Sequence, residues 1–222
     1  MSELQSKCYV LSLTLTCHFS SLGMYDTILA DYLIGAVDGF SPFQQDVIVA
    51  KLAQHLNPDG RLYVIGMNPI PDHATPPADV VTEVRRVRDS CILLAGHRPY
   101  REFPLDWMNR HLDRANFEVV NTKSFTILHS EESILRQLRV GQSKLPLFPN
   151  DELRRGMEAY GLELTERVKT AVRGTATGRI PLSYDYVIAA KPKAAVADAG
   201  TSTEVRGATE TALLLPTSTS SS

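Results

Sequence analysis

Residues 24–67, MYDTILADYLIGAVDGFSPFQQDVIVAKLAQHLNPDGRLYVIGM, contain the pattern that decides the fold. The run at 26–31, DTILAD, is short, apolar and bounded by acids, which is typical of a strand buried on both faces of a parallel sheet. Residues 62–65 predict a second strand, and a glycine-containing loop at 32–40 and then a helix separate the two. This order predicts a parallel βαβ unit with a right-handed crossover.

The helix between these strands has start and stop signals. In Ser41-Pro42-Phe43-Gln44, serine can cap the helix, proline can occupy its first position and glutamine can complete a capping box. The sequence Asn57-Pro58-Asp59-Gly60 favours a turn that ends the helix. The predicted buried face repeats at helical spacing and consists of Ile48, Val49, Leu52, Ala53 and Leu56.

The rest of the chain continues in the same way. Apolar periodicity predicts helices that start near Pro76 and after Pro104, followed by a strand at 117–128. Further helices are expected at 131–140 and 151–169, and a last strand at 184–190. Residues 193–222 are rich in Ala, Thr and Ser and are predicted to be a disordered tail.

Bulk composition limits the classes of function. The chain has 222 residues, of which 43% are hydrophobic and 22% charged, and a formal charge of −2. These values are typical of one globular domain and predict no general attraction to nucleic acid or anionic membranes. No apolar run approaches the ~20 residues of a membrane span. The three cysteines lack metal or disulfide spacing, which favours reduced thiols and a cytoplasmic location.

Three phrases, in this order, carry a family resemblance. Asp31-Tyr32 follows the strand DTILA, residues 56–64 read LNPDGRLYV, and residues 111–120 read HLDRANFEVV. Their order and spacing resemble the class I S-adenosylmethionine-dependent methyltransferases. In that family an acid ends the fourth strand, a phrase like L-x-P-x-G leads into the next strand, and L-x-x-A-G-F-x-x-V leads into another. Residues 184–191 are similar to the antiparallel strand that closes the family's sheet.

The resemblance covers residues 24–128 and 182–191, and it implies a fold and an activity. The implied fold class is α/β, with a partial Rossmann-like methyltransferase sheet, flanking helices, an antiparallel last strand and a helical insertion before it. The implied activity is transfer of a methyl group from S-adenosylmethionine to a small-molecule acceptor. The domain would span 24–192 after an atypical N-terminal segment at 1–23, and the insertion at about 130–179 would form a lid over the acceptor.

One part of the family pattern is absent. Family members bind the methyl donor at a glycine-rich turn after the first strand, whereas Gly23 is the single glycine before Tyr25. We therefore expect a truncated domain whose binding of S-adenosylmethionine is weak or absent. Methyl transfer depends mainly on positioning of the reacting groups, so no catalytic residue is predicted.

The resemblance also implies site residues around the end of the first strand. Asp31, Tyr32 and Leu33 are expected at the cofactor, and Tyr32, Asp38 and Phe40 at the acceptor. Each has a structural alternative, because Asp31 can cap a loop, Tyr32 can pack in the core and Asp38 can shape a turn.

Other reactive residue types fit structural roles. No histidine pair has metal-ligand spacing, so no metal site is predicted, and Cys91 lies on the apolar stripe of its helix. The single histidines, His97, His111 and His129, are interpreted as surface or packing residues. Arg85, Arg86 and Arg88 form a basic helix face, which is interpreted as solvated rather than as an anion site.

Two other classes of function stay open. The first is a non-catalytic interaction module derived from the methyltransferase fold, because a truncated sheet would leave the DTILA strand near an edge that a protein partner or a second copy could cover. The second is a fragment of a nucleotide-binding oxidoreductase, which the missing glycine fingerprint disfavours.

Overall fold

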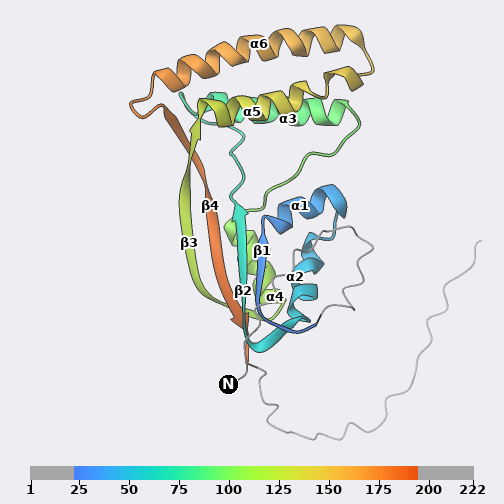
Figure 1. Cartoon of the computed structure of the whole chain (residues 1–222), viewed down its shortest axis with the longest axis vertical. Helices are drawn as coiled ribbons and strands as arrows, with labels where there is room; N and C mark the ends of the chain where they lie inside the picture. The colour runs from blue at the N-terminus through green and yellow to red at the C-terminus, as the bar shows by residue number, and fades with distance from the viewer. Residues whose placement is uncertain (1–22, 195–222) are drawn as a thin grey trace, which may run out of the picture.

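The computed structural model describes residues 23–194, which form a mixed sheet with a layer of helices beyond one end of its strands (Figure 1). The sheet has four strands in the order β1-β2-β4-β3. Their bounds are Tyr25–Asp31 for β1, Leu56–Met67 for β2, Phe117–Ser130 for β3 and Arg179–Pro192 for β4. The atypical N-terminal segment and the disordered tail predicted from the sequence lie outside the described residues, apart from Gly23 and 193–194.

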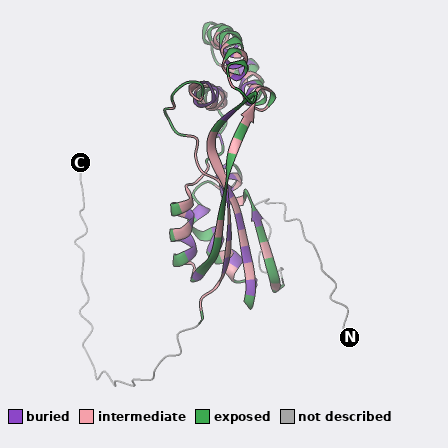
Figure 2. Ribbon diagram, turned by 90° about the vertical axis from the view of Figure 1, so that its left-hand side faces the viewer, coloured by how far each residue is buried: buried purple, intermediate pink, exposed green. Residues whose placement is uncertain are grey.

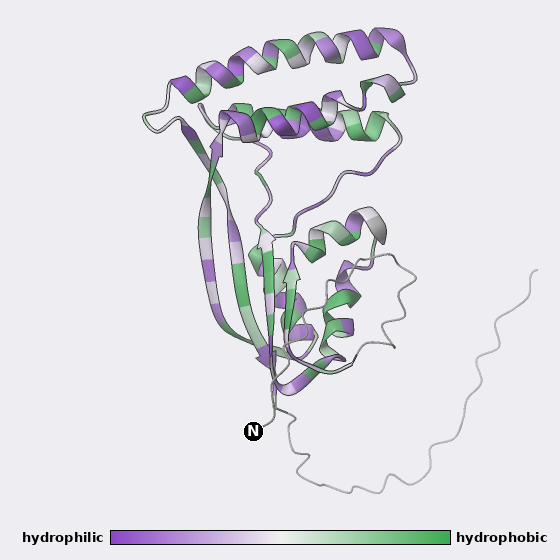
Figure 3. Cartoon of the chain, in the orientation of Figure 1, coloured by the Kyte–Doolittle hydropathy of each residue, from purple (hydrophilic) through white to green (hydrophobic). Residues whose placement is uncertain are grey.

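Strand directions confirm the expected α/β class. β1 and β2 are parallel, with Ile28 opposite Leu62 and Ala30 opposite Val64, as the βαβ prediction required. β4 lies between β2 and β3 and is antiparallel to both, which confirms the antiparallel last strand. Apolar residues concentrate in the upper parts of β1 and β2 and in the lower half of β4 (Figure 3).

One face of the sheet is covered by three helices, α1 (Leu33–Phe40), α2 (Gln45–Ala53) and α4 (Leu105–Arg114). They lie to one side of the strands in Figure 2. Apolar burial on this face supplies most of the favourable free energy that holds the layers together. The buried side chains at this contact include Ala30, Leu62, Val64, Ile188 and Ala190 from the strands and Val37, Val49, Leu52, Met108 and Leu112 from the helices.

A second core joins the helices of the layer beyond the strand ends. α3 (Asp79–Leu94), α5 (Glu131–Gln142), the short helix η2 (Leu145–Leu147) and α6 (Asp151–Arg173) contribute Val84, Ile134, Leu138, Leu164 and Val168, among others. Side-chain caps fix two helix starts, because Ser130 Oγ accepts from the Ser133 amide and Asn150 Oδ1 from the Glu152 and Leu153 amides. The expected helical insertion is therefore present between β3 and β4.

Two local predictions near the first crossover were wrong. Residues 33–40 form α1 rather than a loop, because packing of its apolar side chains on the sheet outweighs the low helix propensity of Gly35 and Gly39. Ser41 is the C-cap of α1 and not the cap of the next helix, which begins at Gln45 without a side-chain cap.

Two strand predictions also need correction. Residues 57–60 belong to β2 rather than to a turn, and an irregularity in the β1–β2 register between Tyr25 and Thr27 absorbs the extra residues. β1 is not buried on both faces, since Leu29 is 60% exposed. The reason is that β1 is an edge strand of the described sheet and the helices cover one of its faces.

Candidate functional site

A cavity of about 640 Å³ lies between the carboxyl ends of β1 and β2 and the helical layer. Its walls come from Tyr32 after β1, the end of β2, α3, α5, the 99–102 loop, the end of β3 and Asp185 in the middle of β4. Open α/β sheets bind ligands at the carboxyl ends of their parallel strands, and the volume lies within the usual range for a small-molecule site. This cavity is therefore the candidate site.

Tyr32 is held rigidly at the start of α1. Its backbone is left-handed, with φ 47°, which is unfavourable for a residue with a side chain. The Tyr32 amide donates to the Ile65 carbonyl at 3.0 Å, and its own carbonyl accepts from Ala36 at 3.1 Å. These bonds direct the Tyr32 ring into the cavity wall. Burial, then a hydrogen bond to the Asp185 carboxylate, raise the pKa of Tyr32 to about 12, so the phenol stays protonated as a donor.

A second acid, Glu102, lies beside this pair. Its carboxyl packs on α1, where a Cβ added to Gly35 would lie 2.8 Å from Oε2. Burial raises the pKa of Glu102, the positive charge of Arg88 opposes that rise, and Asp185 adds to it. Among the described residues, no hydrogen bond to the Glu102 carboxylate is formed. Glu102 and Asp185 therefore place two acidic groups on the sheet side of the cavity.

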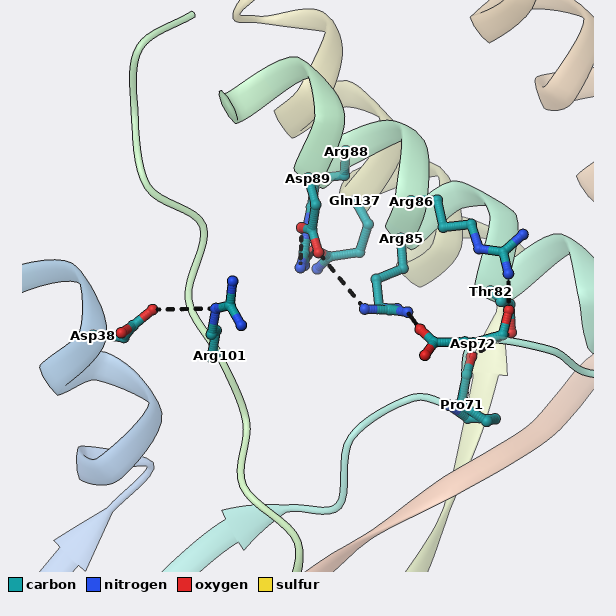
Figure 4. A network of polar contacts seen from close by, with 10 residues as sticks. All are labelled: Asp38, Pro71, Asp72, Thr82, Arg85, Arg86, Arg88, Asp89, Arg101 and Gln137. Atoms are coloured by element: carbon teal, nitrogen blue, oxygen red, sulfur yellow. Dashed lines mark hydrogen bonds and ion pairs between the residues drawn. The ribbon is translucent and has the colours of Figure 1, made fainter. Parts of the chain in front are cut away.

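The opposite wall is basic. Arg85 and Arg88 of α3 point toward the cavity in Figure 4 and are held by acids and an amide. Arg85 pairs with Asp72 at 2.8 Å and with Asp89 at 3.8 Å. Arg88 pairs with Asp89 at 2.7 Å and donates to Gln137 Oε1 at 2.6 Å. Arg136 of α5 also lines the cavity.

The interpretation of the arginines as a solvated face is wrong for two of the three. The side chains of Arg85 and Arg88 are 26% and 24% exposed, because α5 packs against α3 and turns this face toward the cavity. Arg86 is exposed, as predicted, and bonds the Asp72 carbonyl.

The residues expected at the cofactor and acceptor are only partly brought together. Tyr32 lines the cavity, and Asp31 lies next to it as the exposed last residue of β1. Leu33 packs against the core under α1. Asp38 is buried, and it does not line the cavity. Phe40 is the last residue of α1.

Asp38 fixes the loop that carries Glu102. Its Oδ1 accepts from Gln45 Nε2 at 2.9 Å, and its Oδ2 lies 3.4 Å from Arg98 Nε and 3.9 Å from Arg101 Nε. Figure 4 shows Arg101 reaching from that loop to Asp38 on α1. Asp38 thus acts on the cavity through the loop rather than by facing a ligand there.

The histidines and Cys91 have structural surroundings. His129 lines the cavity and its Nε2 donates to the Leu182 carbonyl at 3.1 Å, while burial lowers its pKa. His111 stacks on Trp107 with ring centroids 3.5 Å apart, and His97 is exposed. Cys91 is buried, which raises the pKa of its thiol. Within residues 23–194, no group of three or more potential ligands could hold a metal ion.

Sequence reasoning missed Glu102, Asp185 and Arg136. Asp185 carried a signal, because it is an acid within the otherwise apolar strand YDYVIAA. Glu102 lies in an irregular loop and Arg136 on an ordinary amphipathic helix, so neither stands out without the tertiary structure.

Among the described helices, none is long and apolar enough to cross a membrane.

Comparison with known proteins gives structural likeness alone. No family model and no curated protein matches the chain. Solved structures that share part of the architecture include a Bacillus halodurans protein classed as a methyltransferase, with 14% identity and a TM-score of 0.44, covering 77% of this chain and 65% of that one. The mycolic acid cyclopropane synthase CmaA1 has 14% identity and a TM-score of 0.40, and the match covers 78% of this chain and 58% of that one. A Geobacter sulfurreducens S-adenosylmethionine-dependent methyltransferase has 14% identity and a TM-score of 0.32, and the match covers 77% of this chain and 59% of that one.

The chain thus spans less than two thirds of the length of each of these structures. The parallel β1–β2 crossover, the antiparallel β4 and the insertion before it are the features of the fold that the sequence resemblance implied.

Proposed function

We propose that the chain is a methyltransferase-like protein, related in function to S-adenosylmethionine-dependent enzymes, that binds a small-molecule acceptor in the cavity at the ends of β1 and β2. The observation that carries this proposal is the position of Tyr32. It follows the strand-end acid Asp31, has a strained backbone and forms part of the cavity wall. Strained residues of this kind concentrate at functional sites.

The cavity has groups that can orient an acceptor. Tyr32 can donate a hydrogen bond, and the Glu102 and Asp185 carboxylates can accept one or hold a proton from a bound molecule. α3 and α5 line the far side of the cavity, and we propose that the insertion, to which α5 belongs, covers a bound acceptor. Positioning of this kind is the main contribution that a protein makes to group transfer.

The described residues fit only one wall of a donor site. A glycine cradle allows a cofactor to approach the backbone closely. Gly35 and Gly39 follow β1, but the space beside them is occupied by the side chains of Glu102 and Tyr100. Asp31 and Tyr32 therefore offer a partial surface to S-adenosylmethionine, with Leu33 packed beneath them against the core, and we propose that this chain binds the donor weakly.

Two measurements test the proposal. Titration with S-adenosylhomocysteine is expected to give a dissociation constant weaker than micromolar, so micromolar binding by this chain would overturn the claim of weak donor binding. Transfer of labelled methyl groups from millimolar S-adenosylmethionine to a mixture of small acceptors is expected to be slow and to be lost in Tyr32→Ala. Absence of transfer at millimolar donor would overturn the proposed function. Tyr25→Ala, at the other end of β1 and outside the cavity lining, is the control.

Within residues 23–194 one face of the sheet has no covering layer, which favours a second candidate function, that of an interaction module. Side chains alternate along a strand, so Leu29 and Phe125 share the face opposite α1, α2 and α4. Both are large apolar side chains, 60% and 54% exposed. Exposed apolar surface of this kind often marks an interaction site, and a second copy of the chain presents the same surface.

Light scattering after size-exclusion chromatography separates the two candidates. The interaction module predicts a dimer that Leu29→Lys and Phe125→Lys convert to a monomer. Leu162→Lys, which changes an equally exposed leucine on α6, serves as the control. A monomer in the unmodified protein at high concentration would eliminate this candidate.

A further inference from the structure

The charges around the cavity are divided between its two walls. Glu102 and Asp185 come from the 99–102 loop and β4, on the sheet side, with the Tyr32 phenol beside them. Arg85, Arg88 and Arg136 come from α3 and α5, on the side of the helical layer. The cavity therefore has an acidic wall and a basic wall.

Two lining charges break this division, and both form ion pairs. Asp89 lies on the basic wall, where it pairs with Arg88 at 2.7 Å and with Arg85 at 3.8 Å. Arg101 lies on the loop of the acidic wall and pairs with Asp38 of α1 at 3.9 Å. Asp89 therefore offsets part of the positive charge of its own wall, whereas the partner of Arg101 lies outside the cavity lining.

The basic wall keeps unused hydrogen-bond donors. Arg136 makes no ion pair within the described residues, and Arg85 Nε is buried there without a hydrogen-bond partner. Gln137 accepts from Arg88 through Oε1, which leaves its amide N–H groups available. Three arginines face two carboxylates, Asp89 and the exposed Asp72, so one positive charge remains in excess.

The acidic wall keeps unused acceptors. The Tyr32 phenol bonds to Asp185, whereas Glu102 has no hydrogen-bond donor among the described residues. Its carboxyl is packed against α1 and is partly shielded from water. Burial of a polar group without a partner costs free energy, so a cationic or hydrogen-bond-donating group of a ligand would be favoured at this position.

We propose that the cavity takes a small zwitterion, with an anionic group bound at Arg136 and Arg85 and a protonated amine bound at Glu102 and Asp185. This rests on the assignment of the cavity as the acceptor site. An uncharged ligand would leave the charges of both walls uncompensated, whereas a zwitterion places an opposite charge at each wall. Carboxylate and phosphate-type anions both suit arginine donors.

Titrations followed by protein NMR, without any methyl donor, test the proposal. The probes are 4-aminobutyrate and 3-aminopropylphosphonate, compared with butylamine, butyrate, propylphosphonate and the uncharged butanamide. Each zwitterion is expected to bind about tenfold or more tightly than either of its half-molecules. The two zwitterions distinguish a carboxylate from a phosphate-type ligand. Equal binding of the zwitterions and butanamide to the unmodified protein would overturn the proposal.

Variants assign the two ends of the ligand. Arg136→Ala is expected to weaken butyrate and zwitterion binding about tenfold and to leave butylamine unchanged. Glu102→Gln is expected to weaken butylamine binding and to leave butyrate binding unchanged. Arg139→Ala, on the same helix as Arg136, and Glu158→Gln, on α6, are the matched controls. Loss of both half-molecules in either cavity variant would contradict the assignment of ends.

The outcomes separate this inference from the proposed function. If zwitterions bind as expected and methyl transfer fails, the proposed function falls and the binding site stands. If transfer occurs but charge has no influence on binding, the zwitterion proposal falls and the acceptor site stands.

Discussion

Gly66→Ala tests the packing that places the cavity loop. Gly66 of β2 lies opposite Tyr186 of β4 in the antiparallel register. A Cβ at Gly66 would clash with the Tyr186 hydroxyl and would lie 2.5 Å from its Cζ. Tyr186 is 1% exposed and its hydroxyl donates to the Phe103 carbonyl at 3.0 Å, next to Glu102. The ring therefore has no free space into which it can move without loss of that bond.

The magnitude follows from three contributions. Overpacking of a core costs about 1–3 kcal/mol, and loss of the Tyr186–Phe103 bond about 1 kcal/mol more. Replacement of glycine within a strand recovers roughly 0.5–1 kcal/mol of backbone entropy. The free energy of unfolding should therefore fall by about 1–3 kcal/mol, which corresponds to roughly 3–10 °C in melting temperature for a domain of this size.

Urea unfolding followed by circular dichroism measures the change. Gly156→Ala is the matched control, because Gly156 lies in α6 and an added Cβ would meet nothing within 4 Å. That substitution should instead raise the unfolding free energy by about 0.5–1 kcal/mol. If Gly66→Ala were as stable as the unmodified protein, the close packing of Tyr186 on Gly66 would be refuted.

Three further predictions concern the helical layer and Glu102. Leu164→Ala should lower the free energy of unfolding by about 2–5 kcal/mol, because Leu164 is 0% exposed in the second core. The control Leu162→Ala, on the same helix but at a 64% exposed residue, should change it by less than about 0.5 kcal/mol in the same urea assay. Asn150→Ala should cost about 1 kcal/mol by removing the cap of α6, while Asn150→Asp keeps it, and equal melting temperatures for the two would contradict the cap. The pKa of Glu102 is raised in the folded state, so the folded state holds this proton to higher pH than the unfolded state does. The unmodified protein should therefore lose stability relative to Glu102→Gln as pH rises above the ordinary glutamate pKa. A difference in unfolding free energy between the two proteins that stayed constant from pH 4 to 7 would argue against this.

Local pattern was sufficient for most elements. The helices α3, α4, α5 and α6 and the strands β3 and β4 all begin or end within a few residues of their predicted positions. These segments have a clear apolar period or a cap such as Asn150, and both are properties of neighbouring residues. The prediction failed at α1, where packing against the sheet stabilises a helix that contains two glycines.

The site was less predictable than the fold. Asp31 and Tyr32 were identified because they end a strand, and Tyr32 does line the cavity. Asp38 could not be placed, since its partners Arg98 and Arg101 lie about 60 residues away in the sequence. Glu102 and Arg136 face the cavity only because the loop folds over α1 and α5 packs on α3.

The sequence by itself determined the alternation of strands and helices, the parallel crossover between β1 and β2 and the position of the insertion. These follow from apolar periodicity and turn residues, which act over a few positions. The tertiary structure decided that one face of the sheet is uncovered within the described residues and that two walls of opposite charge meet across one cavity. The physical reason is that burial and charge pairing depend on which segments meet in space, and distant parts of the chain supply those partners.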